Sequence, residues 1–484
     1  MNVIIGAGPA GLSASLELSR HGAPSLVLEK DDVVGGLART VAYKGYRFDI
    51  GGHRFFTKVH LVERLWRELL GEDFLTRPRA SRIFYRGRYF QYPIEPFDAL
   101  LGLGPWEALH CTLSYLRARV LPRPSEESFE DWIVNRFGDR LYKTFFKTYT
   151  EKVWGMPCTE IRAEWAAQRI KGLSVASVLM HALRRNGSQP LKTLIHEFQY
   201  PRLGPGMMWE RAQAEAERLG ARVVFNAPVE RIRWRPGAVT SVVAGGQEYC
   251  GDRFISTMAI RDLIAALDPA PAELVREIDS FRYRDFLTVA LIVEGPSPFP
   301  DNWVYVHSPE VQVGRIQNYN NWSPDMVPEP GMTCLGLEYF CFEGDGLWKT
   351  PDASLIDLAK REIATLGLID VSRVVDGAVV RMPKAYPVYD GSYQQGLEAI
   401  RAFLREVPNL QLAGRNGMHR YNNQDHSMLT GILAARNILG AHYDLWRINV
   451  DAEYHEEGYD LTEEDVAALG TTQPLQPERL SPRR

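Results

Sequence analysis

A glycine-rich turn near the start of the chain is the feature that most constrains its fold. Gly6, Gly8 and Gly11 fit the pattern G-x-G-x-x-G, directly after an apolar run over 2–5 and before a helical pattern over 10–21. The first glycine allows a tight turn, the second lets the backbone approach a pyrophosphate, and the third permits close helix–sheet packing. The sequence therefore predicts a strand–turn–helix unit with a dinucleotide at the helix N-terminus.

A terminal acid on the next strand supports this interpretation. The strand predicted over 25–29 ends on Glu29, which could accept hydrogen bonds from ribose hydroxyls. For the hexapeptide alone, an ordinary glycine turn in an α/β protein is the alternative. Together the strand, helix, second strand and acid favour a Rossmann-like site.

Composition excludes several other classes. The chain has 484 residues, of which 45% are hydrophobic and 24% charged, as in soluble globular proteins. The net charge of −4 gives no basic surplus, so we expect no nucleic-acid partner. The five cysteines show no C-x-x-C spacing, which predicts neither a disulfide framework nor a metal site and favours a cytoplasmic location.

Periodic segments continue along the chain after the glycine turn. Helices are predicted over 60–76, 126–148 and 207–219, and a last α/β segment over 409–440. Strands are predicted over 222–226, 239–243, 287–293, 303–307 and 333–340. The chain therefore alternates α/β stretches with a long helical stretch before residue 205.

The run over 30–40 adds a second pair of glycines and an arginine. It resembles the second glycine motif of FAD-binding oxidoreductases of the amine-oxidase type. The resemblance implies that Gly36 and Arg39 contact the FAD pyrophosphate, for which a forked guanidinium is well suited. A solvated surface charge stays open as the alternative for Arg39.

Five further motifs follow in a fixed order. They lie over 49–57 (Gly-Gly-His loop), 149–155 (Tyr-Thr-Glu-Lys-Val-Trp-Gly), 314–324, 337–339 and 420–425. In this order they resemble the UDP-galactopyranose mutase family and, more broadly, the FAD-dependent amine-oxidase superfamily that includes protoporphyrinogen oxidase. The resemblance covers about residues 1–445 and adds site residues to those found from spacing.

For the reaction site, the resemblance implies residues that act on a phosphorylated sugar. His53 would lie by the flavin and Arg169 and Arg315 would hold the substrate diphosphate. The residues implied to bind substrate are Tyr149, Trp154, Tyr339, Tyr421 and Asn423, the last standing where the family has an acid. Each role has an alternative. His53 could instead form a structural hydrogen bond, and Arg169 an interdomain ion pair. Trp154 and the tyrosines at 339 and 421 could instead be packed residues.

For the cofactor, the resemblance implies contacts from distant segments. Val229 would touch the adenine end through its backbone, and the late segment with Gly414, Arg415 and Met428 would approach the flavin. The implied fold class is α/β, with a discontinuous Rossmann-like FAD-binding domain, a helical insertion and a mixed β-sheet substrate domain. The expected bounds are 1–60, 205–280 and 405–445 for the FAD domain, 61–204 for the mainly helical insertion, 281–404 for the α+β substrate domain, and 446–484 for an extension with a disordered end.

The implied function is a mutase or isomerase of pyranose–furanose type. Its substrate would be a sugar on a nucleotide or phosphate carrier, and the reaction would proceed through a covalent adduct on reduced FAD, so an external reductant is expected. The alternative is an FAD-dependent oxidoreductase acting on a CH–NH, CH–CH or CH–OH bond. A flavin-binding scaffold without turnover is a third possibility.

The stretch 77–123 carries eight arginines and three acidic residues. It is compatible with a solvated face, with attraction of an anionic substrate, or with contact to a membrane surface through the apolar run over 99–116. Because Glu107 and His110 interrupt that run, the first two are expected rather than the third.

Overall fold

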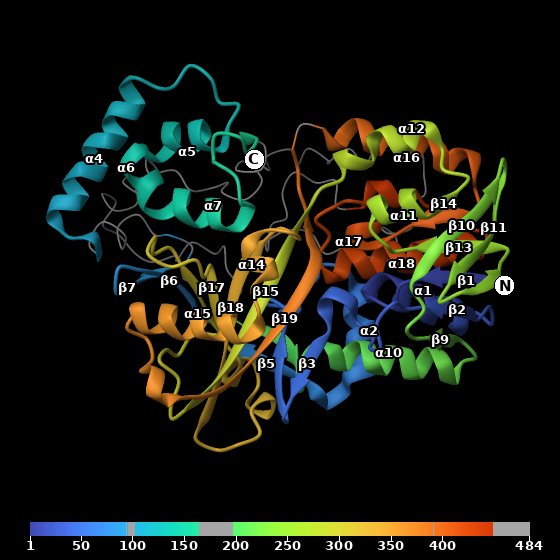
Figure 1. Ribbon diagram of the computed structural model, residues 1–484, viewed down its shortest axis with the longest axis horizontal. Helices are drawn as coiled ribbons and strands as arrows, with labels where there is room; N and C mark the ends of the chain where they lie inside the picture. The colour runs from blue at the N-terminus through green and yellow to red at the C-terminus, as the bar shows by residue number, and fades with distance from the viewer. Residues whose placement is uncertain (93, 95–101, 164–196, 391, 449–484) are drawn as a thin grey trace, which may run out of the picture.

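A parallel sheet forms around the N-terminal glycine turn in the computed structural model, which describes residues 1–92, 94, 102–163, 197–390 and 392–448 (Figure 1). Within these residues the sheet has five strands in the order β20–β13–β1–β2–β9, and all neighbours are parallel. The bounds are β1 (Asn2–Ile5), β2 (Ser25–Leu28), β9 (Arg222–Val224), β13 (Arg253–Ser256) and β20 (Leu410–Leu412). Its inner strands are apolar and buried, as parallel strands covered on both faces are.

Helices cover this sheet and bring distant parts of the chain together. They are α1 (Pro9–Arg20), α2 (His60–Leu70), α10 (Gly206–Arg218), α17 (Gly414–Gly417) and α18 (Gln424–Ile438). Helices α1 and α18 pack closely because Gly431 faces α1: a Cβ there would lie 2.0 Å from the Ala10 carbonyl oxygen. This packing fixes the late segment against the glycine turn.

A second sheet and its helices extend the same half of the molecule (Figure 1). Among the described residues its strand order is β12–β11–β10–β14. The bounds are β10 (Val229–Arg235), β11 (Ala238–Ala244), β12 (Gln247–Cys250) and β14 (Leu267–Asp268), with helices α11 (Ile260–Ala266), α12 (Ala272–Glu277) and α16 (Tyr393–Glu406) nearby.

The other half is built on a mixed sheet of the order β19–β15–β18–β17–β16–β6–β7, counted over the described ranges. The bounds are β6 (Ser81–Tyr85), β7 (Arg88–Gln91), β15 (Tyr283–Glu294), β16 (Trp303–Val306), β17 (Arg315–Asn318), β18 (Met332–Cys341) and β19 (Val374–Pro387). Helix α15 (Asp352–Thr365) packs an apolar face onto it. Two antiparallel pairs link the halves: the hairpin of β3 (Thr40–Tyr43) with β4 (Tyr46–Asp49), and the long-range pair of β5 (Phe74–Pro78) with β8 (Glu197–Pro201).

A helical unit lies above the mixed sheet (Figure 1). It comprises α4 (Pro105–Val120), α5 (Phe129–Phe137), α6 (Asp139–Leu141), the π-helical turn η3 (Tyr142–Lys147) and α7 (Thr148–Trp154). The prediction of one helix over 126–148 is wrong at Gly138, whose φ of 84° breaks the helix. A Cβ at Gly138 would lie 2.7 Å from the Tyr115 backbone nitrogen, so the break also lets α4 approach.

The helix predicted over 60–76 is also too long. It ends at Leu70 because Gly71 has a φ of 55°. A 3-10 turn (Gly71–Asp73) follows, and then β5, which pairs with β8 about 120 residues later in the chain. Strands β5 to β8 therefore lie within the stretch 61–204 that was expected to be mainly helical. A one-dimensional pattern does not show a strand whose partner is that distant.

The α/β fold class expected from the sequence is confirmed. The parallel sheet draws its strands from residues within 1–60, 205–280 and 405–445. Over the described part of the chain, no helix combines the length and the hydropathy needed to cross a membrane.

Candidate functional site

The first glycine turn has no room for a Cβ at its first and third glycines. Gly6 has a φ of 97°, and a Cβ there would lie 2.3 Å from the Thr257 hydroxyl oxygen. A Cβ at Gly11 would lie 1.9 Å from the Gly6 carbonyl oxygen. No side chain caps the start of α1, so its first N–H groups can face an anion.

The second glycine turn packs against the first. Gly35 and Gly36 have φ values of 97° and 52°, and a Cβ at Gly36 would lie 3.3 Å from the Gly8 Cα. Arg39 forms an ion pair of 2.7 Å with Asp31 at this turn. The guanidinium predicted to contact a pyrophosphate is therefore next to the turn, held by a carboxylate.

Glu29 connects the end of β2 to the first turn. Its carboxylate accepts the Ala7 N–H at 2.6 Å and the Asp31 N–H at 3.0 Å. Burial raises the pKa of Glu29, while these two backbone donors lower it. The carboxylate is thus placed beside the turn, where a ribose would meet it.

The remaining predicted cofactor residues lie around this cradle. Gly414 has a φ of 84°, and its N–H donates to the Thr430 hydroxyl at 3.0 Å. Met428 is buried and accepts the Trp66 indole N–H at 3.0 Å, while Val229 begins β10. Two closely packed glycine turns, an uncapped helix start and a buried acid fit an FAD pyrophosphate and ribose.

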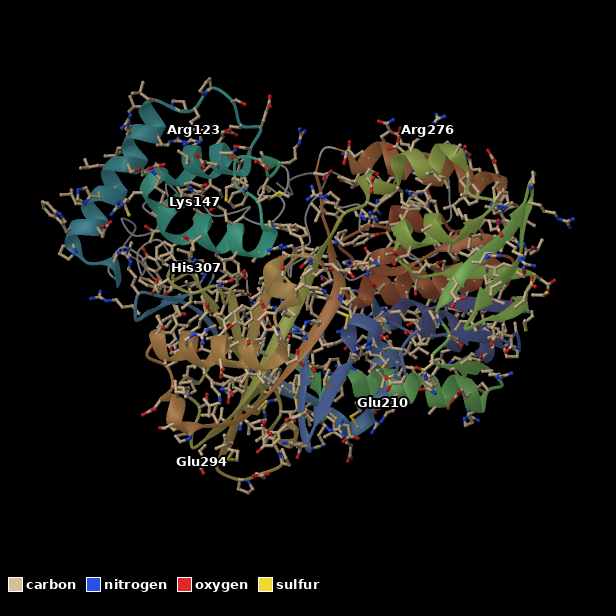
Figure 2. The ribbon with its side chains drawn as sticks, in the orientation of Figure 1. Arg123, Lys147, Glu210, Arg276, Glu294 and His307 are labelled. Carbon is tan, nitrogen blue, oxygen red and sulfur yellow. The ribbon has the colours of Figure 1, made fainter. Side chains whose placement is uncertain are left out.

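A cavity of about 250 Å³ lies between the helical unit and the mixed sheet. Its walls combine aromatic and aliphatic side chains with two arginines; they are formed by Ile83, Tyr92, Ile94, Phe129, Phe145, Phe146, Tyr149, Thr150, Val153, Trp154, Arg284, Tyr305, His307, Arg315, Phe340, Tyr386 and Tyr421. Of the described residues, no Asp or Glu lines this cavity. Figure 2 shows His307 between the helical unit and the sheet.

Arg315 lies on the cavity side of β17 and is bonded to Glu338 of β18. Its Nε donates to the Glu338 carboxylate, which also accepts the Gln317 amide at 2.8 Å. Burial would lower the pKa of Arg315, but the adjacent carboxylate outweighs it, so the pKa is raised. Glu338 is fully buried, and burial raises its pKa against the opposing effect of Arg315.

His53 lies next to Arg315, on the loop that follows β4. A Cβ at Gly51 would lie 3.7 Å from both the Arg315 Nη2 and the His53 Cε1. Burial, together with the charges of Arg415 and Arg315, lowers the pKa of His53 to about 3. His53 is therefore neutral at pH 7, and its buried Nδ1 has no hydrogen-bond partner among the described residues.

Two further arginines belong to this region. Arg284 lines the cavity and donates to the carbonyls of Val153 at 3.1 Å and Phe340 at 2.8 Å. Arg415 lies 5.4 and 5.0 Å from the ring centres of Tyr386 and Tyr421. Sequence reasoning missed Arg284 and Tyr386 because neither stands in a glycine or motif context; both reach the cavity through the pairing of β15 with β19.

The predicted aromatic residues mostly lie in the cavity wall. Tyr149 stacks on His307 with ring centres 4.7 Å apart, and Tyr421 stacks on Tyr386 at 5.6 Å. Trp154 also lines the cavity. Burial lowers the pKa of His307 to about 3, so this imidazole is neutral as well.

Two predicted residues lie away from the cavity, and a third is not described. Tyr339 lies in the core under α15, because its neighbour Glu338 faces Arg315 and adjacent side chains of a strand point to opposite faces. The structure does not bring Tyr339 to the cavity, so we no longer expect it to contact substrate. Asn423 occupies the N-cap of α18, where its N–H donates to His426 at 3.3 Å. Arg169 lies outside the described residues.

Comparison with known proteins places the chain among flavoproteins. The profile of the family described as "Flavin containing amine oxidoreductase" matches residues 9–439. AofH of Mycobacterium tuberculosis, which its name assigns to the flavin-containing monoamine oxidases, is 27% identical over 290 residues, covering 55% of this chain and 59% of AofH. The 4,4'-diapolycopene oxygenase of a Methylomonas species is 38% identical over 304 residues, covering 58% and 60%. The matched part thus spans about three fifths of these two relatives.

Solved structures show the same fold at low identity. Reduced UDP-galactopyranose mutase superposes with a TM-score of 0.78 and 23% identity, covering 91% of this chain and 95% of that chain. Putrescine oxidase bound to putrescine superposes with a TM-score of 0.59 and 18% identity, covering 90% and 98%. At these identities the likeness concerns the fold alone.

Proposed function

Because the chain belongs to the flavin-containing amine oxidoreductase family and uses FAD, we propose that it isomerises an anionic sugar derivative, in which the sugar is joined to a phosphate or diphosphate carrier. The proposal rests chiefly on the charge of the cavity. It is supported by the order of motifs in the sequence and by the fold shared with a mutase.

The cavity wall carries two guanidiniums and, in its described part, no carboxylate. Arg315 is balanced by Glu338, but Arg284 is bonded only to carbonyl groups in the described contacts. Arginine stays protonated at neutral pH, and the two nearby imidazoles are neutral. A protonated amine would meet a positive field here, whereas a phosphate would be attracted.

The protein residues would position and stabilise charge. When bound, reduced FAD would supply the electron pair that displaces phosphate from the anomeric carbon. Arg315 and Arg284 would bind the phosphate oxygens on which negative charge develops, and the hydroxyls of Tyr149, Tyr386 and Tyr421 would add neutral donors. Neutral His53 would offer a hydrogen bond at its Nδ1 rather than take up a proton, because its pKa is far below 7.

The second candidate is an oxidoreductase that acts on an apolar substrate. Two observations favour it: the relatives in sequence are named as a monoamine oxidase and a 4,4'-diapolycopene oxygenase, and the cavity lining includes the apolar side chains of Ile83, Phe129 and Phe145. This reaction would bleach the oxidised flavin when substrate is added and would need no prior reduction.

The first proposal requires a reductant and implies a cellular location. An external reductant would have to supply the reduced flavin. We also propose a cytoplasmic location, because all five cysteines are free thiols.

The test measures pyranose–furanose interconversion with dithionite-reduced enzyme and a panel of nucleotide sugars, including UDP-galactose. Reduced wild-type enzyme should form the other ring isomer, and oxidised enzyme should not. A matched pair of variants locates the site: Tyr421→Phe, in the cavity wall, should lower turnover, while Tyr339→Phe, on the opposite sheet face, should keep it. If no sugar is converted and an amine or polyene bleaches the flavin instead, the second candidate replaces the first.

A further inference from the structure

Helix α4 carries an apolar stripe that no other described element covers. Five large side chains are between 48% and 76% exposed; they are Trp106, Leu109, Leu113, Leu116 and Val120. An α-helix turns 100° per residue, so their spacing of three and four residues places them within an arc of about 80°. On the opposite side of α4, Cys111 and Ala118 are buried.

The position of α4 leaves this stripe facing outward. The helix packs on α5 and α6, and the close approach of Gly138 to Tyr115 fixes its inner face. Figure 1 shows α4 at the outer edge of the helical unit, away from the parallel sheet. The apolar stripe is therefore not part of the cavity wall.

Positive charge surrounds the stripe. Arg117 and Arg119 are exposed on either side of it, and neither guanidinium forms an ion pair within the described structure. Arg88, the first residue of β7, donates to the Gly102 carbonyl just before α4. Glu107, the acid of this helix, is bonded to Arg140. An apolar stripe between unpaired arginines matches an anionic lipid surface in both hydropathy and charge.

We propose that α4 docks on an anionic membrane surface, lying in the plane of the interface with its stripe in the lipid. Trp106 would anchor one end, as tryptophan does at membrane–water interfaces. The residues that interrupt the apolar run do not oppose this: Glu107 is neutralised by Arg140, and the His110 ring packs edge-on against Trp106. Folding thus separates the apolar residues from the acid that adjoins them in sequence.

A second copy of the chain fits the stripe less well. A two-fold pairing of α4 helices would bring Arg117 and Arg119 of one copy against those of the other, and the helix has no unpaired acid to balance them. Like charges at an interface oppose association. The lipid surface is therefore the occupant that the charges favour.

The experiment is co-sedimentation of the full-length, FAD-loaded protein with vesicles of phosphatidylcholine containing phosphatidylglycerol, and with vesicles of phosphatidylcholine alone. The protein should bind the anionic vesicles and bind less at high salt. Leu113→Gln with Leu116→Gln should lower binding at least tenfold. Arg117→Gln with Arg119→Gln should lower it on the order of thirtyfold.

The control is a double variant on α12, Val275→Gln with Arg276→Gln, which also removes one exposed apolar side chain and one exposed arginine. Figure 2 shows Arg276 on the other half of the molecule, well apart from the helical unit, so binding should not change. All variants should keep the flavin absorbance and melting temperature. No binding to anionic vesicles, equal binding by the α4 variants, or a dimer that those variants dissociate would each overturn the proposal.

Discussion

The pair formed by Arg315 and Glu338 allows the structural and functional roles of one arginine to be separated. In Arg315→Gln, the Glu338 carboxylate stays fully buried and loses its positive partner, keeping the 2.8 Å bond from Gln317. Breaking a buried ion pair in this way costs about 3–5 kcal/mol of folding free energy. The single variant should therefore be markedly less stable in urea unfolding.

The instability of Arg315→Gln should also depend on pH. Burial already raises the pKa of Glu338, and the loss of Arg315 raises it further. A carboxyl group whose pKa is higher in the folded state binds more protons there than in the unfolded chain, so stability falls as the pH rises from the unfolded pKa to the folded one. The stability deficit relative to wild type should be smallest in acid and largest above the folded pKa.

The double variant Arg315→Gln with Glu338→Gln removes both charges. It should recover most of the lost stability, because two amides of similar size can bond to each other and to Gln317. It should not recover ligand affinity: loss of a guanidinium contact to phosphate is worth about 1.5–3 kcal/mol, or roughly ten- to a hundredfold in the Kd for UDP measured by calorimetry. If the double variant is stable and binds UDP as tightly as wild type, Arg315 serves only to pair Glu338, and the proposed phosphate contact is wrong.

Three further predictions concern the cradle, a buried acid and the second arginine. Gly11→Ala should lose FAD, seen as colourless purified protein, because its Cβ would lie 1.9 Å from the Gly6 carbonyl oxygen; a yellow variant would contradict the assignment of this turn. Burial raises the pKa of Asp49 to about 7, so the folded wild-type protein loses stability as the pH rises from about 4 to about 7. Asp49→Asn should therefore gain up to about 4 kcal/mol in unfolding free energy relative to wild type over this range. A difference in urea unfolding that does not depend on pH would refute this. Arg284→Gln should weaken UDP binding about tenfold while the flavin absorbance is kept, and an unchanged Kd would restrict Arg284 to its carbonyl bonds.

The sequence predicted the first glycine turn well because a turn depends on short-range geometry. The positive φ of Gly6 and the contact between Gly11 and the Gly6 carbonyl lie within one turn of chain, so the order of residues determines them. Glu29 meets the same turn from 22 residues further along, because β2 pairs in parallel with β1 and ends beside the turn. The prediction of a helix over 60–76 was wrong for the opposite reason, because β5 forms by pairing with β8, which is distant in the sequence.

Which residues line the substrate cavity depends on the face of the strand that each residue occupies. A sequence motif does not specify that face. The motif over 337–339 contains both Glu338 and Tyr339, and the resemblance implies a site role for Tyr339 alone. A register set by β17 and β15 on either side turns Glu338 toward Arg315 and Tyr339 into the core.

The same distinction between sequence neighbours and spatial neighbours applies to α4. Along the chain, Glu107 and His110 interrupt the apolar run and argue against lipid contact. On the helix, residues three and four apart share a face, and the ion pair with Arg140 offsets the charge of Glu107. What determines the surface is therefore the set of side chains that folding leaves exposed together, and on α4 that set is apolar with arginines at its borders.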